Sequence, residues 1–167
     1  MSHVCSVLFV CLGNICRSPT AHGVFQAKVA QQGLSAHIVV DSAGTADWHT
    51  GKAPDPRAIA EASTRGYDLS ELKARQAMTA DFDRFDYVIA MDESNLQGLQ
   101  QLCPEEYSGH LGLMLEFAPQ QNLVEVPDPY YGGDEGFAEV LDLLEQACDG
   151  LLARACKDFD LAYDSSR

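Results

Sequence analysis

The sequence has no hydrophobic run long enough to cross a membrane. A membrane-spanning helix needs about 20 consecutive apolar residues, and no stretch of the 167 residues approaches that length. The segment Met1–His3 also lacks the basic residues with which a secretory signal peptide begins. We therefore expect a cytoplasmic protein with no membrane partner.

Positive charge is missing from a large part of the chain. Residues 85–150 contain fourteen aspartates and glutamates and no lysine or arginine, whereas the rest carries eleven acidic and eleven basic residues. The net charge is −14. A surface of this sign repels nucleic acid, which is therefore not expected as a partner. The simplest interpretation of the acidic segment is a solvated, solubilising surface.

The six cysteines do not form a metal-binding pattern. The sequence has no Cys-x-x-Cys pair and no cysteine–histidine cluster at zinc spacing, so we predict no metal site. The chain is also too long and too rich in apolar residues to need a disulfide framework. Cys5, Cys148 and Cys156 lie in apolar strand or helix patterns and are expected in the core. Only Cys11 and Cys16 share a polar loop.

Short apolar segments alternate with helical patterns along the chain. The apolar runs that we interpret as buried strands are 4–10, 37–41, 87–91 and 111–117. The expected helices run from Ser18-Pro19 to Gly33, from Asp55-Pro56 to about Thr64, over 93–103, and along the apolar stripe from Phe137 to Ala155. This alternation predicts an α/β fold: a single domain over residues 1–167, with a four-stranded parallel sheet flanked by helices on both faces.

The most informative segment directly follows the first apolar run. It is Cys11-Leu12-Gly13-Asn14-Ile15-Cys16-Arg17-Ser18, and a proline follows that suits the start of a helix. A tight loop between a strand and a helix N-terminus points backbone N–H groups and the helix dipole at one place, where an anion can bind. Gly13 and Asn14 tolerate the left-handed backbone that such a loop requires. We therefore predict a phosphate-binding loop over residues 11–18.

The side chains of this loop suit attack on a phosphate ester. A helix N-terminus and an adjacent arginine favour the thiolate form of a cysteine, which is its nucleophilic form, so Cys11 is the candidate nucleophile. Arg17 is expected to clamp two phosphate oxygens. Ser18 has two compatible roles, to cap the helix and to donate its hydroxyl group to the Cys11 thiolate.

Hydrolysis of a phosphate ester also needs an acid to protonate the leaving oxygen. Two Asp-Pro pairs are candidates. Asp55 precedes a helical pattern with proline at its first position, so it is predicted as a helix N-cap. Asp128 lies in the loop 127–133, Pro-Asp-Pro-Tyr-Tyr-Gly-Gly, and we predict that it is the acid. The alternative for Asp128 is an aspartate that only shapes a turn.

Four motifs together resemble one family. Cys-Leu-Gly-Asn-Ile-Cys-Arg-Ser at 11–18, Asp-Ser-Ala-Gly-Thr at 41–45, Met-Asp-Glu-Ser-Asn at 91–95 and Asp-Pro-Tyr-Tyr-Gly at 128–132 are similar, in order and spacing, to the low-molecular-weight protein tyrosine phosphatases. The resemblance spans nearly the whole chain. It implies hydrolysis of phosphotyrosine monoesters through a phosphocysteine intermediate on Cys11, with no cofactor.

The resemblance also implies roles for single residues. Arg17 would bind phosphate and stabilise the transition state, and Asp128 would act first as general acid and then as general base. The remaining residues of the phosphate-binding loop are Leu12, Gly13, Asn14, Ile15 and Cys16.

Further members of the site follow from the same resemblance. Asn14 would order the loop, with Ser42 as its hydrogen-bond partner. Cys16 would form a reversible disulfide with Cys11 that protects the nucleophile from over-oxidation. The chain departs from many animal members at Leu72, where those proteins have a histidine, but this change affects none of the reacting groups.

Aromatic residues in loops indicate the substrate. By resemblance, Trp48, Tyr130 and Tyr131 form the walls of a slot for a phosphotyrosine ring, too deep for phosphoserine to reach the bottom. Related arginine-phosphate phosphatases carry a threonine in place of Ile15 and lack the paired tyrosines. We therefore expect phosphotyrosine-containing proteins or peptides as partners. Because the two tyrosines can support self-association, we expect a monomer or a weak homo-oligomer.

Two other functions are compatible with parts of the sequence. A thiol-dependent arsenate reductase would share this fold and loop, but such enzymes use further cysteines on a middle segment, and none lies between Cys16 and Cys103. A catalytically dead phosphotyrosine-binding module would have lost Cys11, Arg17 or Asp128. All three are present, so we favour the phosphatase.

Overall fold

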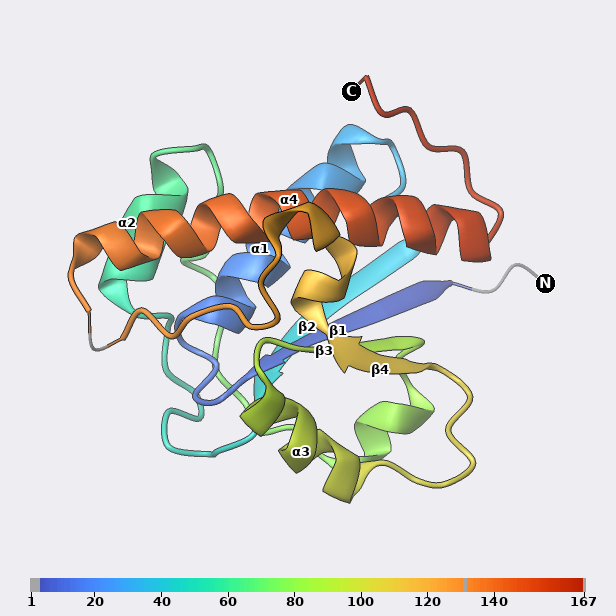
Figure 1. The fold of residues 1–167 in the computed structure, drawn as a ribbon, viewed down its shortest axis with the longest axis horizontal. Helices are drawn as coiled ribbons and strands as arrows, with labels where there is room; N and C mark the ends of the chain where they lie inside the picture. Colours follow the sequence, from blue (N-terminus) through green and yellow to red (C-terminus); the bar gives the residue numbers. More distant parts are fainter. Residues whose placement is uncertain (1–3, 131, 167) are drawn as a thin grey trace.

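The computed structural model describes residues 4–130 and 132–166. Within them, one sheet contains four parallel strands (Figure 1), which are β1 (Cys5–Cys11), β2 (Ile38–Gly44), β3 (Tyr87–Ala90) and β4 (His110–Leu113). The strand order is β2-β1-β3-β4, so β1 lies between β2 and β3. The α-helices are α1 (Arg17–Gln31), α2 (Pro56–Ser63), α3 (Glu93–Leu102) and α4 (Asp134–Asp158).

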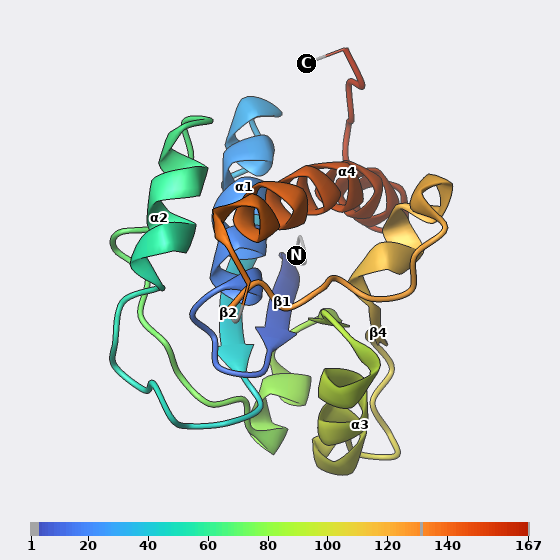
Figure 2. The same ribbon diagram turned by 60° about the vertical axis from the view of Figure 1, so that its left-hand side comes forward.

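The central strand β1 is buried along its whole length because both faces of the sheet are covered. Val7 and Phe9 belong to one hydrophobic core and Leu8 and Val10 to another, as the two-residue period of a strand requires. Helices α1 and α4 pack against each other on the first side, with α2 beside them, whereas α3 packs against β3 and β4. Figure 2 shows these helices on opposite sides of the sheet. The predicted α/β architecture is confirmed.

Two strands differ from their predicted extents. β2 continues from Asp41 to Gly44 because its last three residues pair with the last three of β1. β4 ends at Leu113, and residues 114–117 form a 3₁₀ helix instead of continuing the strand. Glu116 closes that turn, since its carboxylate accepts a hydrogen bond from the Leu113 N–H at 2.6 Å. A short apolar run alone does not distinguish a buried strand from a buried helical turn.

The predicted caps place two helix ends correctly. Asp55 is the N-cap of α2, and its carboxylate accepts a hydrogen bond from the Arg57 N–H at 2.8 Å. Pro56 occupies the first helical position, where its missing N–H costs nothing. After α1, Gly33 has a φ of 73°, a left-handed conformation that glycine adopts without steric cost.

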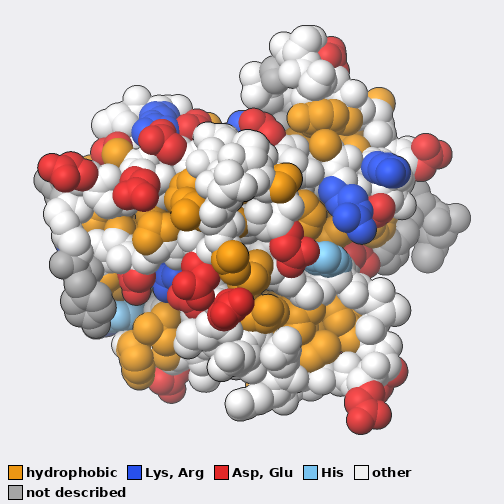
Figure 3. Space-filling view, in the orientation of Figure 1, with side chains coloured by type: hydrophobic (Ala, Val, Ile, Leu, Met, Phe, Trp, Pro, Cys, Tyr) orange, Lys and Arg blue, Asp and Glu red, His pale blue; other side chains and the backbone are white. Residues whose placement is uncertain are grey.

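The exposed side of α4 is acidic. Its solvent-facing carboxylates include Glu135, Glu139, Asp142 and Asp149, and acidic side chains are spread over the face of the molecule shown in Figure 3. This placement agrees with the interpretation of the acidic segment as a solvated surface. Among the residues described, no helix combines the length and apolar character that a bilayer crossing requires.

Candidate active site

The predicted phosphate-binding loop joins the carboxyl end of β1 to the start of α1. Three carbonyl groups of residues 11–15 accept hydrogen bonds from the N–H groups of Thr45, Ala46 and Asp55, at 2.9, 2.9 and 2.8 Å. In the described parts of the chain, no hydrogen bond is donated by a backbone N–H of residues 12–16. The carbonyl groups of the loop therefore bind neighbouring segments of the same chain, and its backbone N–H groups remain available to an anion.

Close packing against the end of β2 fixes the shape of this loop. Asn14 has a φ of 57°, as predicted for a left-handed position. Gly13 is not left-handed, and a Cβ atom there would instead lie 3.0 Å from the His49 ring. At Gly44 a Cβ atom would lie only 2.7 Å from the Leu12 carbonyl oxygen. A larger residue at position 44 would therefore displace the loop.

Hydrogen bonds around Ser18 can stabilise a negative charge on the Cys11 sulfur. The Ser18 Oγ lies 3.0 Å from the Cys11 Sγ and accepts a hydrogen bond from the Asn14 amide at 2.7 Å. The Ser18 hydroxyl can then donate a hydrogen bond either to the sulfur or to the Ala43 carbonyl oxygen, 3.3 Å away. The shorter contact becomes charge-assisted when the sulfur is a thiolate. Ser18 lies in the first turn of α1, whose N-cap is Cys16, so its predicted capping role is wrong.

The loop-supporting contacts differ from the predicted Asn14–Ser42 pair. The Asn14 Oδ1 accepts from the Arg75 N–H at 3.1 Å, and the Ser42 hydroxyl pairs with the His22 Nδ1 at 3.0 Å. The described side-chain contact of Ser42 is therefore with α1. Burial lowers the pKa of His22, which keeps its ring neutral at neutral pH.

Arg17 is fixed at the base of the site. Its side chain is 3% exposed, and its Nη1 donates to the Asp92 carboxylate at 2.6 Å and to the Val126 carbonyl at 3.1 Å. Its Nη2 lies 3.6 Å from the Asp128 Oδ2. Sequence reasoning missed Asp92, which also caps α3 by accepting from the Asn95 N–H at 2.8 Å. Asp92 could have been found from its position between an apolar strand pattern and a helical pattern, where an aspartate is typical of a helix N-cap.

A cavity of 220 Å³ brings the predicted reacting groups together. It is lined by Cys11, Leu12, Gly13, Ile15, Cys16, Arg17, Trp48, His49, Asp128 and Tyr130. Trp48 is 66% and Tyr130 40% exposed, so both rings stand at its mouth. Tyr131 lies outside the described residues. His49, the neighbour of Trp48, was missed because nothing local distinguishes it from a surface histidine.

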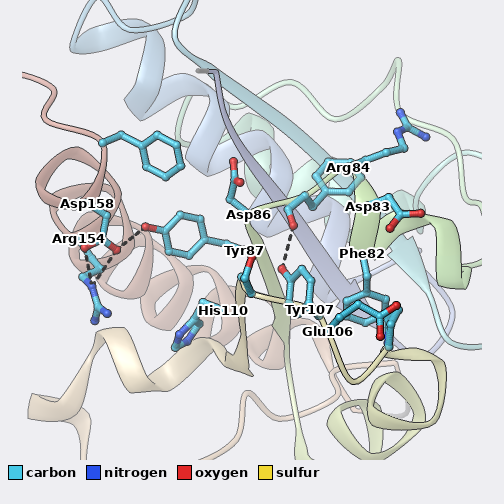
Figure 4. Close-up of a pocket in the computed structure, with 15 residues that line it drawn as sticks. Phe82, Asp83, Arg84, Asp86, Tyr87, Glu106, Tyr107, His110, Arg154 and Asp158 are labelled. Carbon is cyan, nitrogen blue, oxygen red and sulfur yellow. Dashed lines mark hydrogen bonds and ion pairs between the residues drawn. The ribbon is translucent and has the colours of Figure 1, made fainter. Parts of the chain in front are cut away.

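A larger cavity of 620 Å³ lies at the amino ends of β3 and β4 (Figure 4). Tyr87 donates there to Asp158 at 2.5 Å, and Tyr107 donates to the Phe85 carbonyl at 2.8 Å. Its charged lining is mainly acidic, and Arg154 is already held by Asp158 at 3.0 Å. Carboxylates repel a phosphate dianion. The smaller cavity is therefore the candidate active site.

Cys16 differs from a reactive cysteine. Burial, with a smaller effect of Asp55, raises its pKa to about 12, so it is a neutral thiol at neutral pH. All six cysteines are unpaired. No group of three metal-binding side chains occurs in the described part of the chain.

Comparisons with known proteins assign the family. A sequence profile described as low molecular weight phosphotyrosine protein phosphatase matches residues 6–161. A low molecular weight protein-tyrosine-phosphatase of Streptomyces coelicolor is 45% identical over 150 residues, which are 88% of this chain and 91% of the relative.

Solved structures agree with that assignment. A protein tyrosine phosphatase from Entamoeba histolytica is 40% identical, with a TM-score of 0.88 over 92% of this chain and 98% of that one. A Drosophila arginine phosphatase is 30% identical, with a TM-score of 0.83 over 89% of this chain and 96% of that one. This chain therefore belongs to the low molecular weight phosphotyrosine protein phosphatase family.

Proposed function

We propose that this protein hydrolyses phosphotyrosine in proteins or peptides, in the cytoplasm, as a monomer or weak homo-oligomer. The observation that supports this proposal best is the set of groups around one cavity: the Cys11 sulfur, the Arg17 guanidinium and the Asp128 carboxyl group. The backbone amides of residues 12–16 complete the set. A nucleophile, an oxyanion site and an acid are the parts that cysteine-dependent ester hydrolysis needs.

In the first step the Cys11 thiolate attacks the phosphorus atom. The S–P bond forms as the P–O bond to the tyrosine breaks, and Asp128 protonates the departing phenol oxygen. The loop amides and the Arg17 guanidinium hold the non-bridging oxygens, on which the charge resides. Because these donors stabilise that charge, the proposed step uses no metal and no cofactor.

In the second step water releases phosphate from the cysteine. The Asp128 carboxylate takes a proton from the water, whose oxygen attacks phosphorus while the S–P bond breaks. The thiolate leaves with the electron pair and is stabilised by the Ser18 hydroxyl, 3.0 Å away. Asp128 returns to its protonated form, ready for the next substrate.

The cavity mouth supports phosphotyrosine as the substrate. The rings of Trp48 and Tyr130 provide apolar walls for a phenyl group. A phosphoarginine substrate is the second candidate, because the Drosophila arginine phosphatase shares this fold. Ile15, where the arginine-phosphate phosphatases carry threonine, favours the aromatic substrate.

A panel of phosphopeptides tests this assignment. We expect kcat/KM to be highest for phosphotyrosine, with phosphoserine and phosphoarginine peptides far lower. Trp48→Ala should lower kcat/KM for phosphotyrosine about 3- to 10-fold, which corresponds to the loss of one aromatic contact. Val39→Ala is the control, because Val39 is also exposed but lies towards the amino end of β2. A preference for phosphoarginine would contradict the assignment.

The proposal includes redox protection of the site. A peroxide would oxidise Cys11 to a sulfenic acid, and the sulfur of Cys16 would attack it to form a disulfide with release of water. Cys16 borders the same cavity as Cys11 and is a neutral thiol at neutral pH, so its proton leaves in that water. An added thiol would reduce the disulfide and restore both cysteines.

A further inference from the structure

Arg57, in the first turn of α2, contacts the loop that contains the proposed acid. We call residues 127–130 the acid loop. The Arg57 Nη2 donates to the Tyr130 carbonyl oxygen at 3.0 Å. Its guanidinium carbon lies 5.6 Å from the centre of the Tyr130 ring and 4.7 Å from that of Phe137, in the first turn of α4. Arg57 therefore joins α2 to the acid loop and to α4.

A buried carboxylate orients this arginine. Asp55 accepts from the Arg57 Nε at 3.1 Å and from its Nη2 at 3.0 Å. This two-pronged contact holds the pKa of Asp55 below its usual range. The Asp55 backbone N–H donates to the Ile15 carbonyl oxygen at 2.8 Å. A continuous set of contacts thus connects the phosphate-binding loop, through Asp55 and Arg57, to the acid loop.

Asp128 lies between two tethered residues. On one side, the Val126 N–H donates to the Met91 carbonyl oxygen at 2.9 Å, and the Val126 carbonyl accepts from Arg17 at 3.1 Å. On the other side, the Tyr130 N–H donates to the Asp128 Oδ1 at 3.0 Å, and the Tyr130 carbonyl accepts from Arg57. Removing Arg57 would remove the hydrogen bond to the Tyr130 carbonyl and leave the contacts of Val126 intact.

We propose that Arg57 is a positioning residue that holds the acid loop against the phosphate-binding loop, so that the Asp128 carboxyl group reaches the leaving oxygen. This inference rests on the proposed function. It places the effect of Arg57 in one event, the protonation of the leaving group. Attack by Cys11 and binding of phosphate use the Cys11 sulfur, the loop amides and Arg17, whereas the contacts described for Arg57 are with Asp55, Tyr130 and Phe137.

Leaving groups of different basicity isolate that event. Phenyl phosphate needs a proton on its leaving oxygen, whereas 2,4-dinitrophenyl phosphate does not. In Arg57→Met, we expect kcat/KM for phenyl phosphate to fall about 10- to 100-fold, the size of effect that a small misplacement of a catalytic group produces. For 2,4-dinitrophenyl phosphate the loss should stay below about 3-fold. For Arg57→Lys, kcat/KM for phenyl phosphate should lie between those of Arg57→Met and the unaltered protein, because lysine keeps the charge but lacks the planar guanidinium group.

Two comparisons separate positioning from general damage. Arg65→Met is the matched control, since Arg65 also binds α4, through Asp142 at 2.7 Å and Glu145 at 2.6 Å, and should leave both rates unchanged. In an Asp128→Asn background, Arg57→Met should cause no further loss for phenyl phosphate, because the group it positions is already gone.

Other results would overturn the inference. Equal losses on both aryl phosphates, or additive losses in the double variant, would assign Arg57 a structural role only. A loss confined to peptides would make it a substrate contact. If Arg57→Met does not fold, the leaving-group comparison on Arg57→Lys decides. Failure of the unaltered protein to hydrolyse either aryl phosphate would contradict the proposed function itself.

Discussion

Replacing Cys11 by serine is expected to abolish phosphotyrosine hydrolysis, with a loss in kcat of at least about 10⁴-fold. The thiol is 3% exposed at the base of the cavity, and its sulfur lies 3.0 Å from the Ser18 hydroxyl. A serine there has the shape to fit but not the nucleophilicity, because a hydroxyl group is far harder to deprotonate than a thiol and its hydrogen-bond partner would be the Ser18 hydroxyl, which is not a base. Steady-state kinetics on a phosphotyrosine peptide gives the loss.

Phosphate binding should survive this substitution. The amides of residues 12–16 and the Arg17 guanidinium remain in place, so Cys11→Ser is expected to bind inorganic phosphate in calorimetric titration. Cys103→Ser is the control, because Cys103 lies only half-buried at the end of α3 and should keep full activity. Retention of more than about 1% of the activity by Cys11→Ser would show that another group is the nucleophile.

Arg17→Lys is expected to lower kcat about 10²- to 10³-fold, as removal of a donor to a transition-state oxyanion typically does. The guanidinium uses Nη1 for Asp92 at 2.6 Å and Val126 at 3.1 Å, whereas its Nη2 makes only a longer contact of 3.6 Å with Asp128 and can donate to phosphate. A lysine ammonium cannot present two parallel donors to phosphate while it also pairs with Asp92. The same kinetic assay, with phosphate inhibition for affinity, measures both effects.

Arg84→Lys provides the matched control for Arg17→Lys. Arg84 is exposed beside the large cavity at the amino ends of the strands, whereas the candidate active site lies at their carboxyl ends. Its replacement should therefore not change kcat. A loss of less than about 10-fold in Arg17→Lys would contradict the two-pronged clamp, because a point charge would then be sufficient.

The sequence predicts most of the fold because its signals are local. The alternation of β1 between two cores, the Asp55 cap and the left-handed Gly33 each depend on a few adjacent residues. The end of β4 was not predictable in the same way. Residues 114–117 form a 3₁₀ helix because Glu116 reaches back to Leu113, and apolar residues suit either structure.

The support of the site depends on contacts between distant segments, which the sequence does not reveal. The bond from Arg75 to Asn14 spans 61 residues, and that from Arg17 to Asp92 spans 75. The surroundings of Leu72 were likewise not predictable from the sequence. The family resemblance implies a histidine at this position in many animal members, whereas in this chain Leu72 packs against an apolar cluster. On α1, His22 contacts Ser42, another pairing of distant segments that the sequence does not reveal.

Identification of the phosphorylated residue in rapidly denatured enzyme tests the central claim most directly. Asp128→Asn mixed with 2,4-dinitrophenyl phosphate can form the intermediate without a proton donor but cannot activate water. Dinitrophenol should therefore appear in a burst equal to the enzyme concentration, and mass spectrometry of the peptides should locate the phosphate on Cys11. Phosphate on another residue, or turnover by Asp128→Asn at the rate of the unaltered protein without a phosphoenzyme, would contradict the mechanism.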